Sequence, residues 1–431
     1  MKIAMLTNNY KPFVGGVPVS VERLALGLRE LGHQVTIFAP SYTGQEPEAG
    51  VIRCRALKHQ LPGGIVIPDI FDPTIERAFR EERFDLIHTH HPMLMGQTAL
   101  RLGRKHDLPV VLTYHTRYSQ YLHYLKPWAL LQKDAESRRG TSLGRAEAAL
   151  MSKIQTGLMP ACGRAFARGC DMVLAPSPAI REQLLREGVS CPIRVLTTGL
   201  SPRELAPMPE TSASLRRALA GGRSRVFCTV SRLEPEKDLP FMLRGLAAYK
   251  QQAGDDFRMV FIGGGTQKTA LAAQAQALGL GDQVVFAGTV PHSELPAYYG
   301  AADLFLFSSK SETQGIVLLE AMAAGLPVVA VEGSGICDVV ENGRNGFCTP
   351  NDEELWAAAV CRALGQAHRV LSAGARATAQ DYSQEQIAKR AEGLYLDAIA
   401  LHRQNALSLI PRHAHEGLSL RQQKVLYLGH D

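Results

Sequence analysis

The residues from 308 to 331, SSKSETQGIVLLEAMAAGLPVVAV, predict the fold class of the chain. The segment follows an apolar run at 304–307, contains an apolar stretch long enough for a helix, and ends in a second apolar run at 328–331. A strand, a helix and a strand in this order form a unit of a parallel sheet. Both runs are apolar throughout, as strands covered by helices on two faces require.

The same alternation extends over most of the chain in both directions, and it predicts two doubly wound α/β domains. The segment at 199–224 is rich in Pro, Ser and Gly and is the predicted linker. We therefore assign one domain to 1–198, a second to 199–380, and a C-terminal helix and tail to 381–431, with a return of that helix to the first domain as one option. The other predicted strands are 2–8, 35–39, 86–88, 110–114, 172–175, 226–230, 259–262 and 284–286.

Composition narrows the class of protein. The 431 residues are 45% apolar and 20% charged, which indicates a folded chain with a large core. No run approaches the roughly 18 apolar residues that span a bilayer, and the N-terminus does not resemble a secretion signal, so we expect a cytoplasmic location. The eight cysteines are scattered without a CxxC pair and are expected to be reduced thiols.

The positive charge of the chain is concentrated in one block. Residues 101–168 hold 12 basic and 4 acidic side chains, within a net charge of +6 for the whole chain. Aromatic and basic residues at an interface favour binding to an anionic membrane surface, whereas tyrosines at this spacing also suit a packed helix face. A nucleic-acid partner is not expected, because the block has no known reading motif. The residues predicted to face the membrane or the acceptor are Tyr118, Tyr121, Tyr124, Trp128, Arg138 and Arg139.

Several positions suit an anionic ligand. Gly15 and Gly16 lie between the first strand and the first helix, where backbone N–H groups can approach an anion, although many such turns contain glycine. Arg232 and Lys237 follow a buried strand and suit a diphosphate, unless they only pair with the glutamates of their own turn. Neither a dinucleotide-binding fingerprint nor a P-loop motif occurs, so a Rossmann dehydrogenase and a P-loop NTPase are not expected.

Two glutamates eight residues apart, Glu312 and Glu320, are the most informative pair. Glu312 falls in the loop after a predicted strand, and Glu320 lies about two turns into an apolar helix. A carboxylate in that position needs a partner, which is either a pair of ligand hydroxyls or a buried arginine. Three histidines, His88, His90 and His91, could suggest a metal site, but no acidic or cysteine ligand accompanies them, so a structural or acceptor-site role is favoured.

These motifs resemble the retaining, nucleotide-sugar-dependent glycosyltransferases of family 4, which have the two-domain GT-B fold with a cleft between two Rossmann-like domains. The resemblance runs from the Gly-Gly turn to about residue 400 and rests on E-x7-E followed by AMAAGLPVVA, on SRLEPEKDL and on FIGGG. The family usually has a glycine and an aromatic residue after the first glutamate, where this chain has Thr313 and Gln314. With HTHHP and TYHTRYSQYLHY, the SETQG sequence looks like bacterial diacylglycerol glycosyltransferases.

The resemblance implies a role for each matching residue. Glu312 and the backbone at Gly315 and Ile316 would contact the donor sugar and its phosphates, and Glu320 would bind the ribose. Similar enzymes use no divalent cation for the phosphates, so no metal or cofactor is expected. The residues predicted as catalytic are His115, Glu312, Arg232 and Lys237, and those predicted to bind the donor are Gly15, Gly16, Arg232, Lys237, Gly263, Val290, Glu312, Gly315, Ile316 and Glu320.

The implied activity is transfer of a hexosyl group, most simply glucosyl, from a UDP-sugar to diacylglycerol at the inner face of the cytoplasmic membrane. Alternative acceptors are phosphatidylinositol, a lipopolysaccharide core and a soluble sugar. A nucleotide-sugar epimerase or a catalytically inactive protein that binds a sugar nucleotide would use the same architecture. Analysis of the reaction products distinguishes these options from a glycosyltransferase.

Overall fold

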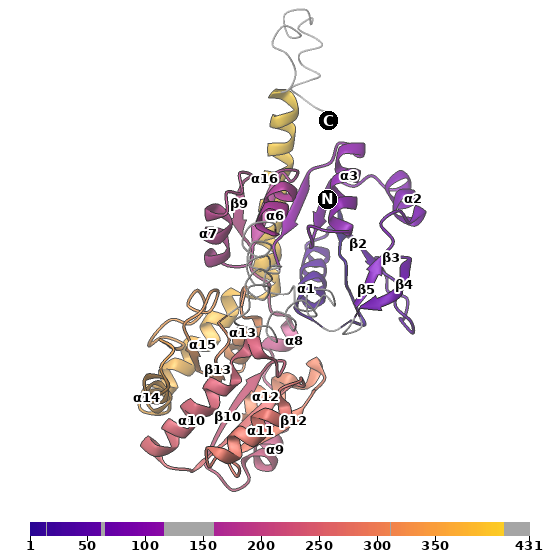
Figure 1. Ribbon diagram of the computed structural model, residues 1–431. Helices are drawn as coiled ribbons and strands as arrows, with labels where there is room; N and C mark the ends of the chain where they lie inside the picture. The colour runs from indigo at the N-terminus through magenta and orange to yellow at the C-terminus, as the bar shows by residue number, and fades with distance from the viewer. Residues whose placement is uncertain (14, 62–64, 116–158, 311, 409–431) are drawn as a thin grey trace, which may run out of the picture.

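The computed structural model describes the chain except for residues 14, 62–64, 116–158, 311 and 409–431. It contains two parallel sheets, each flanked by helices on both faces, in two Rossmann-like domains that lie end to end (Figure 1). The predicted α/β class with two doubly wound domains is confirmed.

The N-terminal sheet has the order β3-β2-β1-β6-β7-β8-β9, and all its strand pairs are parallel. Its strands are β1 (Lys2–Leu6), β2 (Gln34–Pro40), β3 (Val51–Cys54), β6 (Leu86–Thr89), β7 (Val110–Thr113), β8 (Met172–Ala175) and β9 (Ile193–Val195). Its helices are α1 (Gly16–Glu30), α2 (Pro73–Glu81), α3 (Met95–His106), α6 (Met159–Ala167) and α7 (Pro178–Arg186). A separate antiparallel pair is formed by β4 (Ala56–Leu61) and β5 (Ile65–Pro68).

The C-terminal sheet has the order β12-β11-β10-β13-β14-β15 and is also parallel. Its strands are β10 (Arg225–Val230), β11 (Phe257–Ile262), β12 (Val284–Gly288), β13 (Leu304–Phe307), β14 (Val328–Val331) and β15 (Gly346–Thr349). Its helices are α9 (Pro209–Ala220), α10 (Leu239–Ala253), α11 (Lys268–Ala277), α12 (Leu295–Ala301), α13 (Ile316–Ala323), α14 (Glu353–Leu364) and α15 (His368–Asp381), with 3₁₀ turns at Pro235–Lys237 and His292–Glu294.

The predicted linker at 199–224 is mostly helical and is not the irregular segment that its content of Pro, Ser and Gly suggested. It forms α8 (Pro202–Leu205) and α9, and α9 packs against α12 of the C-terminal domain. The prolines and serines that suggested a loop are helix-start residues, because Pro202 and Pro209 occupy the first turns of their helices and Ser201 forms a capping box with Glu204.

The chain crosses between the domains twice, and the two crossings lie side by side. The backbone of Leu200 accepts a hydrogen bond from the Gln384 N–H at 2.8 Å and donates one to the Tyr382 carbonyl at 2.7 Å. Gly199 permits this approach, since a Cβ there would lie 2.9 Å from the Gln384 Cα. Beyond the second crossing, α16 (Gln384–Ser408, yellow in Figure 1) returns along the N-terminal domain and buries Ala388, Ala391 and Tyr395 against a core shared with α1.

Candidate functional site

The predicted cationic residues lie where ligands bind in open parallel sheets. In the C-terminal sheet the direction of strand order reverses between β10 and β13. Open parallel sheets bind ligands in the crevice outside the carboxyl ends of the strands at such a point. Arg232 and Lys237 follow β10, and Glu312 follows β13. The parallel pairing of the two strands therefore brings residues more than 70 positions apart to one edge of the sheet.

Lys237 and Glu312 are in direct contact. The Lys237 Nζ lies 2.5 Å from Glu312 Oε1, and the side chains are only 15% and 20% exposed. Burial acts to raise the pKa of the Glu312 carboxyl, but the charge and hydrogen bond of Lys237 outweigh it, and the pKa lies below its ordinary value. The carboxylate is therefore ionised at neutral pH and can accept hydrogen bonds from sugar hydroxyls.

Arg232 is more exposed and less constrained. It pairs with Glu236 of its own turn at 2.7 Å, which is the alternative partner considered from the sequence, and 47% of its side chain is accessible. Gly263 at the end of β11 has φ +135°, and a Cβ there would lie 1.9 Å from the Ser231 carbonyl oxygen. A side chain at 263 would separate the end of β11 from the turn that begins at Ser231, so glycine allows the backbone next to Arg232 to stay close to β11. Val290 follows the neighbouring strand β12 and is half-buried.

A helix begins shortly after Glu312, in the segment between β13 and β14. Gly315 caps α13 with φ +72°, a conformation that favours glycine, and Ile316 is the first residue of the helix. The backbone N–H groups of the first turn therefore follow Glu312 within a few residues along the chain.

Glu320 is held by a buried ionic cluster that joins the two domains. Its Oε1 accepts a hydrogen bond from Arg23 of α1 at 2.8 Å and lies 3.2 Å from His292 Nε2, and its Oε2 accepts one from the Tyr299 hydroxyl at 3.1 Å. Arg23 also pairs with Glu204 of α8, and the three charged side chains are 5–7% exposed. The buried arginine considered from the sequence is therefore present, and it comes from the opposite domain.

This cluster limits what else Glu320 can bind. A carboxylate oxygen has two lone pairs, so Oε1 is saturated by Arg23 and His292, and Oε2 keeps one free position. Two ribose hydroxyls would need one of the present partners to move, and His292 is the most exposed at 43%. The Glu204, His292 and Glu320 ligand atoms also lie within 4.8 Å of one another, but the guanidinium of Arg23 already supplies positive charge there.

The N-terminal domain contributes a second set of groups. Gly16 is the first residue of α1, and a Cβ built on it meets no atom of the described residues within 4 Å, which leaves space for a ligand beside this position. Gly15 has φ 175°, an extended conformation open to any residue.

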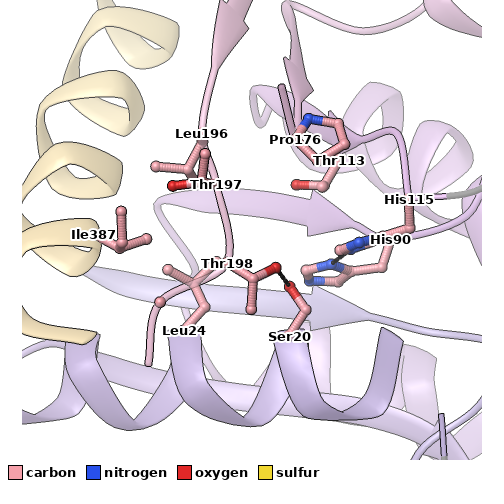
Figure 2. A pocket seen from close by; sticks show the side chains of 11 residues that line it. Ser20, Leu24, His90, Thr113, His115, Pro176, Leu196, Thr197, Thr198 and Ile387 are labelled. Carbon is pink, nitrogen blue, oxygen red and sulfur yellow. Dashed lines mark hydrogen bonds between the residues drawn. The ribbon is translucent and has the colours of Figure 1, made fainter. Parts of the chain in front are cut away.

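His115 follows β7, is half-buried, and adjoins the buried histidines His88 and His90. His90 Nδ1 lies 2.9 Å from His115 Nε2, with the rings stacked, as Figure 2 shows. His88 is fixed by Thr113 at 2.6 Å and by Tyr395 of α16 at 2.7 Å. Burial lowers the pKa of His115 to about 4 and that of His88 to about 3, so both imidazoles are neutral at physiological pH. The hydrogen bonds of His88 fit the structural role that was favoured over a metal site.

The two residues that depart from the family pattern connect the domains. The Thr313 hydroxyl donates a hydrogen bond to the His115 carbonyl at 3.2 Å. The Gln314 amide binds both backbone groups of Thr198, accepting from its N–H at 2.7 Å and donating to its carbonyl at 3.1 Å. Thr198 in turn bonds the Ser20 hydroxyl of α1 at 2.9 Å (Figure 2). Sequence reasoning did not assign a role to Thr313, Gln314 or Arg23, although the unusual SETQG sequence marked the first two.

A water-sized cavity of about 10 Å³ lies between these contacts, lined by Ser20, His90, His115 and Thr197 among others (Figure 2). His90 Nε2 and Thr197 Oγ1 are buried and have no hydrogen-bond partner among the residues that the structure describes.

The predicted membrane-facing residues Tyr118, Tyr121, Tyr124, Trp128, Arg138 and Arg139 lie outside the described residues. Within the part of the chain that is described, no helix combines the length and the apolar character needed to cross a bilayer.

Comparison with known proteins identifies relatives of both domains. The family described as Glycosyltransferase Family 4 matches residues 14–204, and Glycosyl transferases group 1 matches residues 213–380. An alpha-monoglucosyldiacylglycerol synthase of Acholeplasma laidlawii is 27% identical over 93% of this chain and 98% of its own length. A GDP-mannose-dependent alpha-mannosyltransferase of Mycobacterium tuberculosis is also 27% identical, over 82% of this chain and 85% of its own. Among solved structures, Anabaena HepE in complex with UDP has a TM-score of 0.66 and 21% identity, covering 91% of this chain and 99% of that chain.

Proposed function

The chain belongs to the family 4 glycosyltransferases of GT-B fold, and from this membership we propose that it transfers a glucosyl group from a UDP-sugar to diacylglycerol with retention of configuration. One observation carries the proposal. The Lys237 and Glu312 pair lies in the C-terminal crevice, and the residue after Glu312 bonds the backbone of His115 in the N-terminal domain. A donor bound in the crevice would thus have its sugar beside both domains.

The charges suit the departure of a nucleoside diphosphate. In the proposed step the bond between the sugar C1 and the phosphate oxygen breaks, and the acceptor oxygen bonds C1 on the same face. The acceptor proton passes to the departing diphosphate oxygen. Lys237, Arg232 and the N–H groups at the starts of α1 and α13 would stabilise the negative charge that develops there.

The remaining groups orient the sugar. Ionised Glu312 would accept hydrogen bonds from sugar hydroxyls, and neutral His115 would hydrogen-bond the sugar without adding charge. Since Lys237, Arg232 and helix N-termini supply the positive charge, we propose that the reaction needs no divalent cation. Activity that survives EDTA is the expected result, and loss restored by a metal would contradict it.

Three considerations favour a lipid acceptor at a membrane surface. The relative from Acholeplasma laidlawii bears the name of a diacylglycerol glucosyltransferase. The sequence around the histidines looks like that group of enzymes. The block 101–168 is strongly basic, with 12 basic and 4 acidic side chains, as binding to anionic lipid would require. We propose a peripheral location on the inner face of the cytoplasmic membrane, to be tested by sedimentation with anionic and neutral vesicles.

The decisive experiment incubates radiolabelled UDP-glucose with diacylglycerol vesicles and identifies the lipid product by mass. Replacing Lys237 by Gln should lower kcat by about 10²- to 10³-fold, because it removes a group that stabilises the leaving charge. Lys310→Gln is the matched control, since Lys310 lies in the neighbouring loop but is 40% exposed and pairs with Asp238. Equal activity of the two variants would remove Lys237 from the mechanism.

The same assay separates the alternatives. GDP-mannose and other donors are tested in parallel, because the mannosyltransferase relative is equally similar in sequence. Product on phosphatidylinositol, lipopolysaccharide core or a soluble sugar, with none on diacylglycerol, would keep the enzyme class and reject the acceptor. A changed donor in the absence of any acceptor would indicate an epimerase.

A further inference from the structure

An apolar pocket of about 250 Å³ lies inside the N-terminal domain, on the face of the sheet covered by α3, α6 and α7. Leu112 of β7, Phe166 of α6 and Leu184 of α7 line it, and all three side chains are almost completely buried. Apolar atoms that face a void lose dispersion contacts with the partners they would otherwise pack against, so an apolar pocket of this size favours an apolar occupant.

The pocket opens next to the candidate reaction site. Tyr114 lines the pocket, and the next residue, His115, lines the interdomain cavity. Side chains of successive residues at a strand end point to opposite faces, so the pocket and the cavity lie on the two sides of the same strand end. Pro92 and Met93, which follow the histidines of β6, also line the pocket. The loops after β6 and β7 therefore contribute residues both to the apolar pocket and to the interdomain cavity.

The lining distinguishes between kinds of ligand. Among the described residues that line the pocket, Glu187 is the charged one, and its carboxylate accepts a hydrogen bond from Gln183 at 2.7 Å. A soluble sugar would bring several hydroxyls into a surface that offers them few partners, which is costly. An alkyl chain needs no such partners and gains from burial of each methylene.

We propose that this pocket binds one acyl chain of the lipid acceptor and so holds the acceptor hydroxyl beside His115. The inference rests on the proposed diacylglycerol acceptor. It adds that the N-terminal domain recognises the chain itself, so that acceptor preference depends on chain length.

Gly163 offers a way to fill the pocket without disturbing its walls. It lies within α6 and lines the pocket, and a Cβ built there meets no atom of the described residues within 4 Å. Leucine is also a better helix former than glycine. Gly393→Leu is the matched control, because Gly393 is exposed on α16 and a Cβ there likewise meets nothing within 4 Å.

Activity is measured with diacylglycerols of short and long chains. In Gly163→Leu, kcat/KM for long-chain diacylglycerol should fall about tenfold or more, the loss expected when roughly two buried methylenes are displaced. The value for dibutyrylglycerol and the KM for UDP-glucose should stay near those of Gly393→Leu. An equal kcat/KM across chain lengths in the two variants would overturn the proposal.

Cys162 gives a second measurement that uses the unmodified protein and no catalysis. Its thiol is free and exposed, and the residue lines the pocket, whereas the exposed Cys337 lies in the other domain. Dioctanoylglycerol should slow maleimide labelling of Cys162 several-fold and leave Cys337 unaffected. Absence of protection would overturn the proposal.

The two measurements keep the proposals apart. If the wild type does not glycosylate diacylglycerol, the proposed function fails, and the labelling of Cys162 still decides whether the pocket takes a diacylglycerol. If the wild type glycosylates diacylglycerol but Cys162 is unprotected, the function stands and the acyl-chain site fails.

Discussion

Replacing Arg23 by methionine should destabilise the protein strongly, because it removes the cation between two buried carboxylates. Glu320 lies 2.8 Å from the guanidinium, and both Glu320 and Glu204 are less than 10% exposed. At an effective dielectric constant of about 20, opposite charges about 4 Å apart attract by about 4 kcal/mol. Methionine keeps most of the packing but leaves His292 as the one positively charged partner that the described residues offer the two carboxylates, so we expect a loss of about 3–5 kcal/mol. That loss corresponds to a fall in Tm of roughly 10 °C.

Calorimetry and urea unfolding would measure the change, with Arg181→Met as the control, since that arginine is 42% exposed and its partner is a surface glutamate. The control should change stability by less than about 1 kcal/mol. Adding Glu204→Gln to Arg23→Met should recover part of the loss, because it removes one of the two unpaired charges. An Arg23→Met variant as stable as the control, or a double variant less stable than the single one, would refute the account of the cluster.

Three further outcomes are expected. The hydrogen bond to Glu320 raises the pKa of His292 above its ordinary value, against burial, which lowers it. If the donor displaces His292 from Glu320, the pKa of His292 falls on binding and a proton is released. The affinity for UDP should therefore rise with pH, by up to about tenfold per pH unit near the pKa of His292 in the free protein. In calorimetric titrations, His292→Gln should flatten this dependence of UDP affinity on pH. Gln314→Ala removes both hydrogen bonds to the Thr198 backbone and should lower kcat more than it alters donor KM, whereas an unchanged kcat would show that this contact does not align the domains. Gly245→Ala should lower the free energy of unfolding by about 1–3 kcal/mol, because the alanine Cβ would lie 2.6 Å from the buried ring of Trp356. A variant with the same stability in urea as the wild type would contradict this packing.

Local patterns determined most of the secondary structure. The buried strands at 172–175 and 304–307 have the predicted bounds, because an unbroken apolar run between turn residues has few other ways to be covered. The strands β3, β9 and β15 were not predicted, since four residues or fewer of mixed polarity carry little periodic signal. The helices at 202–220 were taken as linker, because proline and serine occur both in loops and at helix starts.

The sequence by itself determined the class of the fold, the Glu312 and Glu320 motif, and the cations after β10, because spacing along one segment sets which residues share a loop or helix. Only the tertiary structure decided which partners these groups have. The contacts of Glu320 with Arg23 and of Gln314 with Thr198 join residues 297 and 116 positions apart. Such pairs depend on how the two domains dock, and no periodicity within either domain encodes that geometry.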